Sequence, residues 1–328
     1  MKIGVIFTGG TIGSRTGAQG IAPAADAPRK LLSDYAAWTG DGTVFPTAEP
    51  YTILSENLTL SHVGVLAACI REKLREWDGV IVTHGTDTLQ YTGAALGYIL
   101  GLSSKPVVLV SANYPLEDSR SNGLDNFRAA VTFLRTVVGV TGVFAAYKNR
   151  GEEVVRIHRA TRLLPHLPLD DLLFSHAGTV AVMTPEGEVK PLADYTEQHD
   201  GQTVMEAESL VSAEGRILRL TAYPGMRCPD TDGVAAVLID GYHSGTLPAS
   251  ALPLRRLCKK AKEASIPVIL TGAPEGGTAY ESGNAHAALG IFNAPPISPI
   301  AAYIKLCLAL ANGRDPFACL TLPLGGDL

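Results

Sequence analysis

Short apolar runs alternate with longer amphipathic segments along the first half of the chain. Residues of the types Gly, Thr, Ser and Asn lie at or just after the end of each run. The apolar runs span 3–7, 79–83, 106–111 and 142–147, and the segments with helical spacing span 63–77, 89–102 and 124–138. Strands that alternate with helices predict a parallel sheet with helices on both faces, and such sheets place their chemistry at the carboxyl ends of their strands.

A polar stretch separates this region from a second, smaller one. Residues 183–209 carry few apolar positions in any period, which is typical of a hairpin or a linker. After it, strand-like and helix-like segments alternate again, at 217–222, 234–240, 252–264, 267–271 and 300–311. We therefore expect an α/β protein with two domains, divided into an N-terminal domain of 1–190, a linker of 191–215 and a smaller C-terminal domain of 216–328.

The composition favours a small molecule as the partner. The 328 residues are 46% hydrophobic and 18% charged, with a formal net charge of -5 and no block of Lys and Arg. A chain without a basic stretch lacks the electrostatic surface that nucleic acids and anionic membranes attract, so neither is expected as a partner. A neutral or zwitterionic small molecule fits this charge better.

The sequence also indicates a cytoplasmic location. No apolar stretch approaches the roughly 20 residues needed to cross a bilayer, and Gly9 and Gly10 interrupt the first apolar run well before the length of a signal peptide. Five scattered cysteines form no C-x-x-C pair and no Cys/His spacing of a metal site. We expect them to be reduced residues that pack in the interior.

The sequence TGGTIG at 8–13 directly follows the first apolar run. Two successive glycines allow the backbone to turn sharply and to bring its N–H groups close to a ligand, and Thr11 then stands at the carboxyl end of the expected strand. For an isolated Gly-Gly-Thr, a tight turn capped by the threonine is the simpler interpretation. Neither G-x-G-x-x-G nor G-x-x-x-x-G-K-[ST] fits here, so a dinucleotide or phosphate loop is not predicted.

The sequence THGTDTL at 83–89 repeats this arrangement after another apolar run. Thr86 and Asp87 are adjacent polar residues on the expected turn, and a segment with helical spacing follows. Taken alone, Asp87 is explained as a helix N-cap and His84 as a structural residue that faces the backbone. Taken together, the two motifs offer a nucleophilic hydroxyl, hydrogen-bonding partners and backbone N–H groups for an oxyanion, which the cleavage of an amide needs.

Both motifs resemble the two signature segments of the bacterial-type L-asparaginase/glutaminase family, and are most similar to those of the cytoplasmic type I asparaginases. The resemblance covers nearly the full chain, since AYPGM at 222–226 and VLIDGYHSGTLP at 237–248 are similar to the second domain of that family. It implies a two-domain asparaginase-like α/β fold, amide hydrolysis without a cofactor or a metal, and assembly into a homodimer or a homotetramer.

The resemblance also implies which residues carry the chemistry. Thr11 matches the threonine nucleophile that attacks the side-chain amide and forms an acyl-enzyme, which water then hydrolyses. Thr86 matches a second catalytic threonine, and Asp87 lies beside it. A threonine is suited to the role of nucleophile because its β-branched side chain holds the hydroxyl in few rotamers.

The same resemblance implies how an amino acid is bound. Asp87 matches the carboxylate that holds the α-ammonium group, and Gly85 in the same loop is expected to contact the substrate. Ser55 in LSENL matches the serine that contacts the α-carboxylate. Glu56 follows where relatives carry Gln or Asp, and is a second group for the ammonium. An ion pair at one end and donors at the other select a free amino acid over a peptide. Without the family, Ser55 is explained as a loop hydroxyl that bonds its own backbone.

Two positions of the expected site depart from the family. An ungapped comparison puts Ile21 where relatives carry a lid tyrosine, and isoleucine neither donates nor accepts a hydrogen bond. Tyr114 and Tyr280 are the alternative tyrosines for this role. In the second domain, Thr246 of HSGTLP takes the position of an asparagine. No G-x-S-x-G motif surrounds His243 and Ser244, so we interpret them as turn residues.

A third departure concerns the catalytic base. Relatives carry a lysine that acts with the aspartate and the second threonine, and counting from Asn149 puts Arg159 at that position. Arginine keeps a positive charge but does not accept a proton near neutral pH. We therefore expect Arg159 to hold the site together by its charge, and we expect the catalytic rate to be lower than that of relatives with lysine. Lys148 is a conceivable substitute, although a solvated surface lysine is the simpler interpretation.

Three functions remain open from the sequence. The first is an amidohydrolase that acts on L-asparagine or a related amino-acid amide. The second is a protein that binds an amino acid without catalysis and serves as a sensor or regulatory subunit. The third is an amide-hydrolysing member of a complex that acts on tRNA, which the absence of a basic run disfavours.

Overall fold

The computed structural model describes the chain as two compact units. The described residues are all except 102–104, 138, 193–204, 208–209 and 274–280. The first unit comprises Met1–Ala207 and Leu324–Gly326, and the second comprises Glu208–Pro323 and Asp327–Leu328. Within the expected linker at 191–215, residues 193–204 and 208–209 lie outside the described part, so the boundaries 1–190, 191–215 and 216–328 stay predictions.

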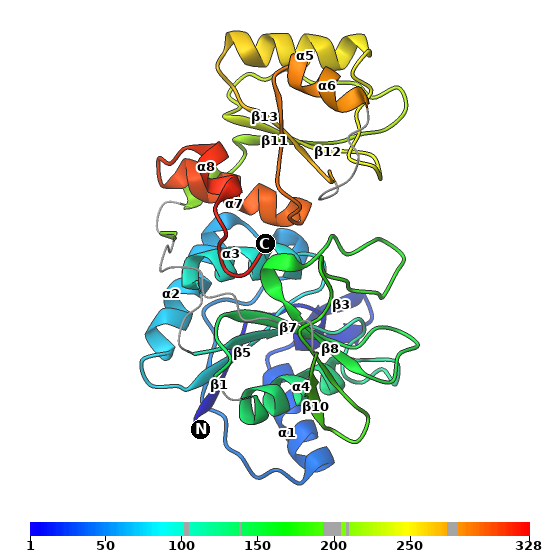
Figure 1. Ribbon diagram of the computed structural model, residues 1–328. Helices are drawn as coiled ribbons and strands as arrows, with labels where there is room; N and C mark the ends of the chain where they lie inside the picture. The colour runs from blue at the N-terminus through cyan, green and yellow to red at the C-terminus, as the bar shows by residue number, and fades with distance from the viewer. Residues whose placement is uncertain (102–104, 138, 193–204, 208–209, 274–280) are drawn as a thin grey trace. The chain divides into compact units, whose positions relative to one another are not determined.

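Among the described residues, the first unit contains an eight-stranded sheet in the order β10-β9-β8-β7-β6-β5-β1-β4 (Figure 1). Strands β4, β1, β5, β6 and β7 run parallel, whereas β8, β9 and β10 continue the sheet in antiparallel pairs. The strands are β1 (Ile3–Phe7), β4 (Thr47–Ala48), β5 (Gly79–Thr83), β6 (Val107–Val110), β7 (Val143–Tyr147), β8 (Val155–Arg159), β9 (Ala181–Met183) and β10 (Val189–Pro191).

The parallel strands are apolar along their length because helices cover both faces of the sheet. Every residue of β1, β5, β6 and β7 is buried, and Val and Ile suit strands that are packed on both sides. Phe144 and Ala146 of β7 cluster with residues of α1 and α4, so the alternation along the strand turns Tyr147 to the opposite face. The helices of this unit are α1 (Ala27–Thr39), α2 (Leu60–Lys73), α3 (Leu89–Leu100) and α4 (Gly123–Thr136).

The second unit is a smaller parallel α/β layer, as its sequence pattern predicts. Its described strands pair in the order β11-β12-β13-β14, all parallel. The strands are β11 (Ile217–Thr221), β12 (Ala236–Asp240), β13 (Val268–Thr271) and β14 (Ile291–Asn293), and the helices are α5 (Leu252–Glu263), α6 (Glu281–Ala288), α7 (Pro299–Ala311) and α8 (Pro316–Thr321). The expected α/β fold class is confirmed.

Two elements differ from the sequence prediction for identifiable reasons. Helix α2 begins three residues earlier than the apolar spacing suggests, because Thr59 caps it with its hydroxyl accepting from the His62 N–H at 3.4 Å, while the His62 ring accepts from the Thr59 N–H. The apolar pattern does not predict strand β8. This strand alternates Arg156 and His158 with apolar residues, and the mixed pattern lacks the continuous apolar run of the other strands.

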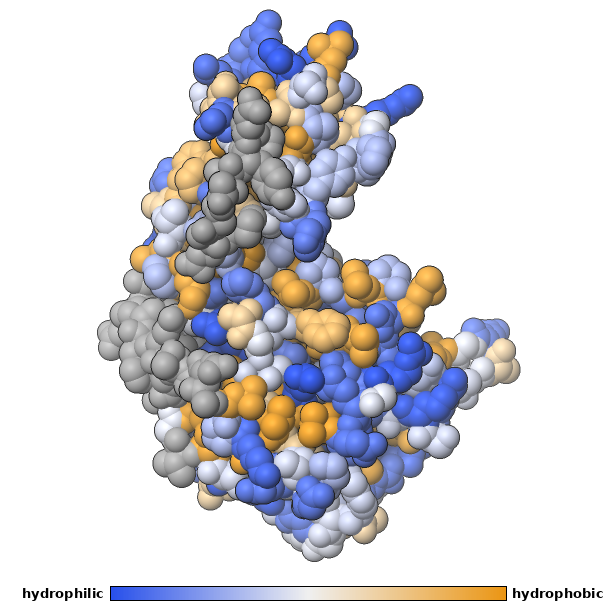
Figure 2. Space-filling view, turned by 45° about the vertical axis from the view of Figure 1, so that its right-hand side comes forward, coloured by the Kyte–Doolittle hydropathy of each residue, from blue (hydrophilic) through white to orange (hydrophobic). Residues whose placement is uncertain are grey.

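The surface and the cysteines agree with a globular protein. All five cysteines are free thiols, and burial raises the pKa of Cys307 to about 12. Figure 2 shows hydrophilic and apolar side chains interspersed over the visible face of the first unit. Among the described residues, no helix combines the length and the apolar character needed to span a membrane.

A fully buried ion pair anchors the last residues of the second unit. The Nζ of Lys305, on α7, lies 2.6 Å from Oδ2 of Asp327, and neither side chain is exposed at all. The same ammonium donates to the carbonyl oxygen of Leu322 at 2.6 Å. A buried charge is tolerated only when it is paired and hydrogen-bonded in this way, so each partner depends on the other.

Removing the Asp327 carboxylate is therefore expected to destabilise the protein. Asp327→Asn should lower the free energy of unfolding by about 3–5 kcal/mol, because it leaves the Lys305 ammonium buried without its counter-charge. Circular dichroism during urea denaturation measures the loss, with the exposed Asp232→Asn as the control. The double variant Lys305→Met/Asp327→Leu should recover most of the stability. A loss below about 1 kcal/mol in Asp327→Asn would contradict this account.

Candidate active site

The TGGTIG and THGTDTL motifs lie next to each other at one edge of the large sheet. β1 and β5 are adjacent and parallel, with Phe7 in register with Thr83, so the two motifs leave the sheet side by side. β1 also pairs with β4 on its other side, and the order of the strands therefore reverses between β1 and β5. In open α/β sheets such a switch point, at the carboxyl ends of the strands, is where ligands bind.

The backbones of the two motifs touch at a pair of glycines. Gly10 has a φ of 74°, and a Cβ added to it would lie 2.3 Å from the backbone nitrogen of Gly85. The Gly10 N–H donates to the carbonyl oxygen of Ile53 at 3.0 Å, and its own carbonyl accepts from the Ser14 hydroxyl at 2.8 Å. Thr11 follows at the start of a short 3-10 helix, η1 (Thr11–Gly13), and is partly exposed. The motif thus presents Thr11 from a turn that only glycine can form.

His84 holds the second motif in place, as the structural interpretation expected. It is buried, and its Nδ1 lies 2.8 Å from the carbonyl oxygen of Gly85, so Nδ1 carries the proton and donates. Its Nε2 lies 2.9 Å from the Thr92 hydroxyl, which must then be the donor. Burial lowers the pKa of His84 to about 4, so the ring is neutral near pH 7.

Ser55 and Asp87 meet across this edge of the sheet. Ser55 begins the short helix η2 (Ser55–Asn57), and its hydroxyl donates to Oδ2 of Asp87 at 3.0 Å. Thr88 fixes the same region, since its hydroxyl donates to the Ser55 carbonyl oxygen at 2.9 Å. A Cβ on Gly85 would lie 2.4 Å from the Ser55 Oγ, so this contact also requires a glycine. The alternative that Ser55 bonds its own backbone is not what the structure shows.

Asp87 does not cap the helix that follows it. The N-cap of α3 is Thr88, with no hydrogen bond from a capping side chain. The Asp87 side chain is exposed and is oriented by Ser55, while its carbonyl oxygen accepts from the Gln90 amide at 3.0 Å. Thr86 is partly exposed between Gly85 and Asp87. The structure thus brings the first motif, Gly85 and Ser55 together with Asp87.

Arg159 does not belong to this cluster, which corrects its expected role. β8 is antiparallel to β7 and pairs Arg159 with Phe144, near the amino end of β7 and away from the carboxyl edge. Its guanidinium donates to the Thr141 carbonyl oxygen at 2.8 Å and covers the Phe144 ring at 4.4 Å. Arg159 is buried and holds the start of β7, so it does not take the place of the family lysine.

The residues at the lid position form an exposed hairpin. β2 (Ser14–Gly17) pairs with β3 (Gly20–Pro23), and Ile21 is 46% exposed in it. Tyr280 lies outside the described residues. Tyr114 stacks beneath the Arg120 guanidinium at 4.0 Å from its ring centre. Its position next to the first motif stays a prediction.

Lys148 lies at the end of β7 and is engaged in an ion pair. Its Nζ is 3.2 Å from Oδ2 of Asp125, with both side chains partly buried. Both residues line a cavity of about 470 Å³ together with Tyr114, Arg120 and Asp171. The cavity carries charges of both signs, so it suits a zwitterion or a polar group better than an apolar ligand.

His166 is a residue of this edge that sequence reasoning missed. Its ring packs against that of Tyr147 at a centroid distance of 5.7 Å and an angle of 89°. Burial lowers the pKa of His166 below the usual 6.5. The Asp171 carboxylate, a hydrogen bond with the Asp170 backbone and the carboxylates of Asp170 and Asp87 oppose this effect without cancelling it. In the sequence, the feature that points to this residue is a histidine followed closely by Asp170 and Asp171, in a segment without helical or strand periodicity.

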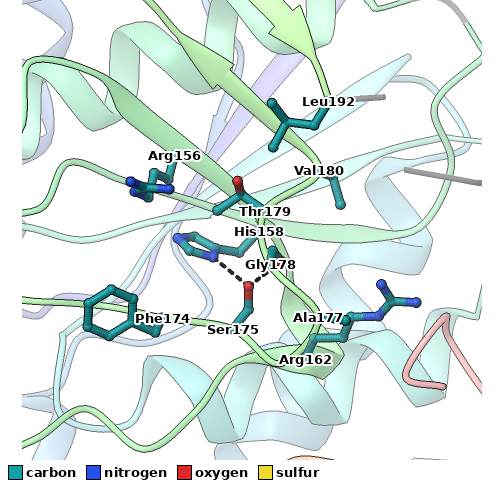
Figure 3. A pocket seen from close by; sticks show the side chains of 10 residues that line it. All are labelled: Arg156, His158, Arg162, Phe174, Ser175, Ala177, Gly178, Thr179, Val180 and Leu192. Carbon is teal, nitrogen blue, oxygen red and sulfur yellow. Dashed lines mark hydrogen bonds between the residues drawn. The ribbon is translucent and has the colours of Figure 1, made fainter. Parts of the chain in front are cut away.

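A separate cavity of about 230 Å³ lies beside β8 and contains none of the expected site residues (Figure 3). The His158 Nδ1 lies 2.9 Å from the Ser175 hydroxyl, which donates to the Gly178 carbonyl oxygen at 2.5 Å, so the ring donates to Ser175. Burial and the Arg156 guanidinium lower the pKa of His158 to about 3. This histidine is neutral and holds the turn that contains Ala177, whose φ is 58°.

The arrangement at the carboxyl edge supplies hydroxyl groups and a carboxylate. Thr11 and Thr86 are partly exposed hydroxyls, and Asp87 is an exposed carboxylate. Within the described part of the chain, no three or more His, Cys, Asp and Glu side chains are placed to hold a metal ion. A hydroxyl at such an edge can attack a carbonyl carbon once a base accepts its proton.

Comparison with known proteins identifies the family. A family model described as asparaginase, N-terminal, matches residues 2–164. The L-asparaginase of Thermococcus kodakarensis is 27% identical over 324 residues, which cover 96% of this chain and 94% of that protein. The chain belongs to the asparaginase family. It is also 29% identical to a glutamyl-tRNA(Gln) amidotransferase subunit of Pyrobaculum aerophilum, over 100% of this chain and 80% of that one.

Solved structures of asparaginases share the fold of this family member. The thermostable L-asparaginase from Thermococcus kodakarensis matches with a TM-score of 0.81 and 25% identity, covering 100% of this chain and 99% of that one. L-asparaginase I from Vibrio cholerae matches with a TM-score of 0.78 and 20% identity, covering 100% and 98%. The asparaginase-like α/β fold that the motifs implied is thereby confirmed.

The contact between Gly10 and Gly85 predicts unequal effects for two glycines of the same motif. Gly10→Ala should destabilise this asparaginase-family protein by about 1–3 kcal/mol, because the added methyl group meets backbone atoms that cannot move aside. Gly13→Ala is the matched control, since a Cβ there meets nothing within 4 Å. Thermal unfolding of both variants measures the difference. Equal melting temperatures would show that the two motifs do not touch.

Proposed function

We propose that this protein hydrolyses the side-chain amide of L-asparagine, or of a closely related amino-acid amide, to the acid and ammonia. The hydrogen bond between Ser55 and Asp87 is the observation that carries the proposal. It joins two segments that lie far apart in sequence and that the motifs assign to the substrate's α-carboxylate and α-ammonium groups. Because Ser55 engages Oδ2, the Oδ1 oxygen of the exposed Asp87 carboxylate is left for an ammonium ion.

In the proposed reaction, Thr11 is the nucleophile. Its hydroxyl oxygen bonds to the amide carbon, and its proton leaves to a base. Backbone N–H groups of the two glycine-containing turns stabilise the oxyanion, the C–N bond breaks, and the protonated amine leaves as ammonia. Water then cleaves the ester, releases the acid and restores the Thr11 hydroxyl. Thr86 assists the transfer of the proton, and Glu56 lies beside Ser55 as a second carboxylate for the ammonium.

The relatives support amide chemistry and leave a second candidate. Several proteins similar to this chain are glutamyl-tRNA(Gln) amidotransferase subunits, including those of Pyrobaculum aerophilum and Thermoplasma volcanium. A chain of that type would release ammonia from an amide for a partner enzyme. The two candidates differ in their substrate: free L-asparagine is turned over by the purified chain alone under the first, and ammonia appears only with the transamidation partner and its tRNA under the second.

The first test is the release of ammonia by the purified chain. We expect turnover of L-asparagine, and Thr11→Val should lower kcat by about a thousandfold or more, because valine keeps the shape and removes the attacking hydroxyl. Thr47→Val, at an exposed position of β4, is the matched control and should retain activity. A protein that binds L-aspartate but releases no ammonia would instead be the amino-acid sensor.

Binding is expected to depend on the charge of Asp87. Asp87→Asn keeps an oxygen for Ser55 but loses the negative charge that attracts an ammonium group. Its affinity for L-aspartate should fall about 10- to 100-fold, which corresponds to about 1.5–3 kcal/mol for a hydrogen bond to a charged group. Titration calorimetry measures the change, and Glu56→Gln serves as a comparison. If both variants lose affinity equally, the ammonium site is not centred on Asp87.

A further inference from the structure

The proposed reaction needs a base that accepts the proton of the attacking hydroxyl, and two expected candidates do not supply it. Arg159 is held by the Thr141 carbonyl oxygen near the amino end of β7. Lys148 lies nearer, but its ammonium is paired with the Asp125 carboxylate at 3.2 Å. We therefore searched the described residues at this edge for another group in a form that accepts a proton.

The ring of His166 lies at the same edge as the second motif. Thr83, the last residue of β5, is in register with Val110 of β6, which is in register with Ala146 of β7. Tyr147 therefore stands one residue further along, level with the start of the loop that contains Thr86. Since the His166 ring packs against that of Tyr147 at 5.7 Å, the histidine belongs to this edge.

His166 also lies on the face of the sheet that carries Asp87. Phe144 and Ala146 point to the face covered by α4, so Tyr147 points to the other face. That face is covered by α3, which contacts β7 and whose first turn directly follows Asp87. The field of the Asp87 carboxylate reaches the imidazole, which agrees with this placement.

The groups around His166 leave it uncharged but ready to accept a proton. Burial against Tyr147 disfavours the imidazolium ion, and the net pKa of His166 lies below 6.5. Three carboxylates, of Asp171, Asp170 and Asp87, favour the imidazolium ion once a proton arrives. The Nε2 atom is buried and has no hydrogen-bond partner among the described residues. A hydrogen bond between the His166 ring and the backbone of Asp170 also favours the imidazolium ion.

We propose that His166 is the proton acceptor of this site and occupies the role that a lysine has in related enzymes, an assignment that rests on the proposed function. The imidazole takes the proton of the Thr11 hydroxyl through Thr86 as the C–O bond forms. It returns that proton to the nitrogen as the C–N bond breaks and ammonia leaves. In the second half of the reaction it takes a proton from water and returns it to Thr11, so the histidine is unchanged after each turnover.

Kinetics of His166 variants with L-asparagine test this assignment. In the wild type, kcat/KM should rise with pH through a single titration below pH 6.5, as the imidazole loses its proton. His166→Gln should lower kcat by about a hundredfold to ten-thousandfold, abolish that titration, and leave the affinity for L-aspartate unchanged. Added imidazole should restore part of the rate of His166→Gly. His176→Gln, on the same segment, is the control and should behave as the wild type with and without imidazole.

The outcomes separate this proposal from the proposed function. Wild-type kcat and pH profile in His166→Gln would overturn the role of His166 while the amidohydrolase stands. A loss of kcat accompanied by weaker L-aspartate binding, with no rescue by imidazole, would also overturn it, because that result describes a packing residue. Failure of the wild type itself to release ammonia would remove the proposed function, and the role of His166 with it.

Discussion

Two backbone segments approach each other so closely at Gly10 and Gly85 that neither residue can carry a side chain. A Cβ on Gly10 would lie 2.3 Å from the Gly85 nitrogen, and a Cβ on Gly85 would lie 2.4 Å from the Ser55 Oγ. The loops after β1 and β5, and the η2 turn, therefore pack against one another at these two glycines. This contact explains the glycines of the two motifs. It also fixes the positions of the loops that carry Thr11 and Asp87.

The histidines of the first unit show how burial and nearby charges set the protonation state of an imidazole ring. His84 and His158 are buried with partners on at least one ring nitrogen, and their pKa values of about 4 and about 3 keep them neutral and inert. His166 is less buried, and the Asp171 carboxylate, a hydrogen bond with the Asp170 backbone and the carboxylates of Asp170 and Asp87 oppose the effect of burial. An imidazole that is neutral at rest but is stabilised after protonation has the properties that a general base requires. The difference lies in the surrounding charges, since all three rings are the same.

The sequence predicted the parts of the structure that local pattern controls. Continuous apolar runs located β1, β5, β6 and β7, and Gly-rich ends located the loops of the site. The bond from Ser55 to Asp87 spans 32 residues and followed only from the family resemblance. The role expected for Arg159 was wrong because counting residues along the sequence does not reveal the direction of a strand. Strand β8 runs antiparallel to β7, so its later residues lie further from the carboxyl edge that carries the site. His166 was missed because its segment has no regular period.

The pairing of β1 has a consequence for how the chain folds. Its partner β5 begins 76 residues later, at Gly79 opposite Ile3, and the Thr8 hydroxyl donates to the Thr83 carbonyl oxygen at 2.7 Å across a similar interval. Contacts of such long separation form slowly, because the loop between them must close first. During synthesis the apolar β1 strand therefore stays unpaired with β5 until residues 79–83 have been made, and an unpaired apolar strand is prone to aggregate. Because the site needs both strands, it forms only after this pairing is complete.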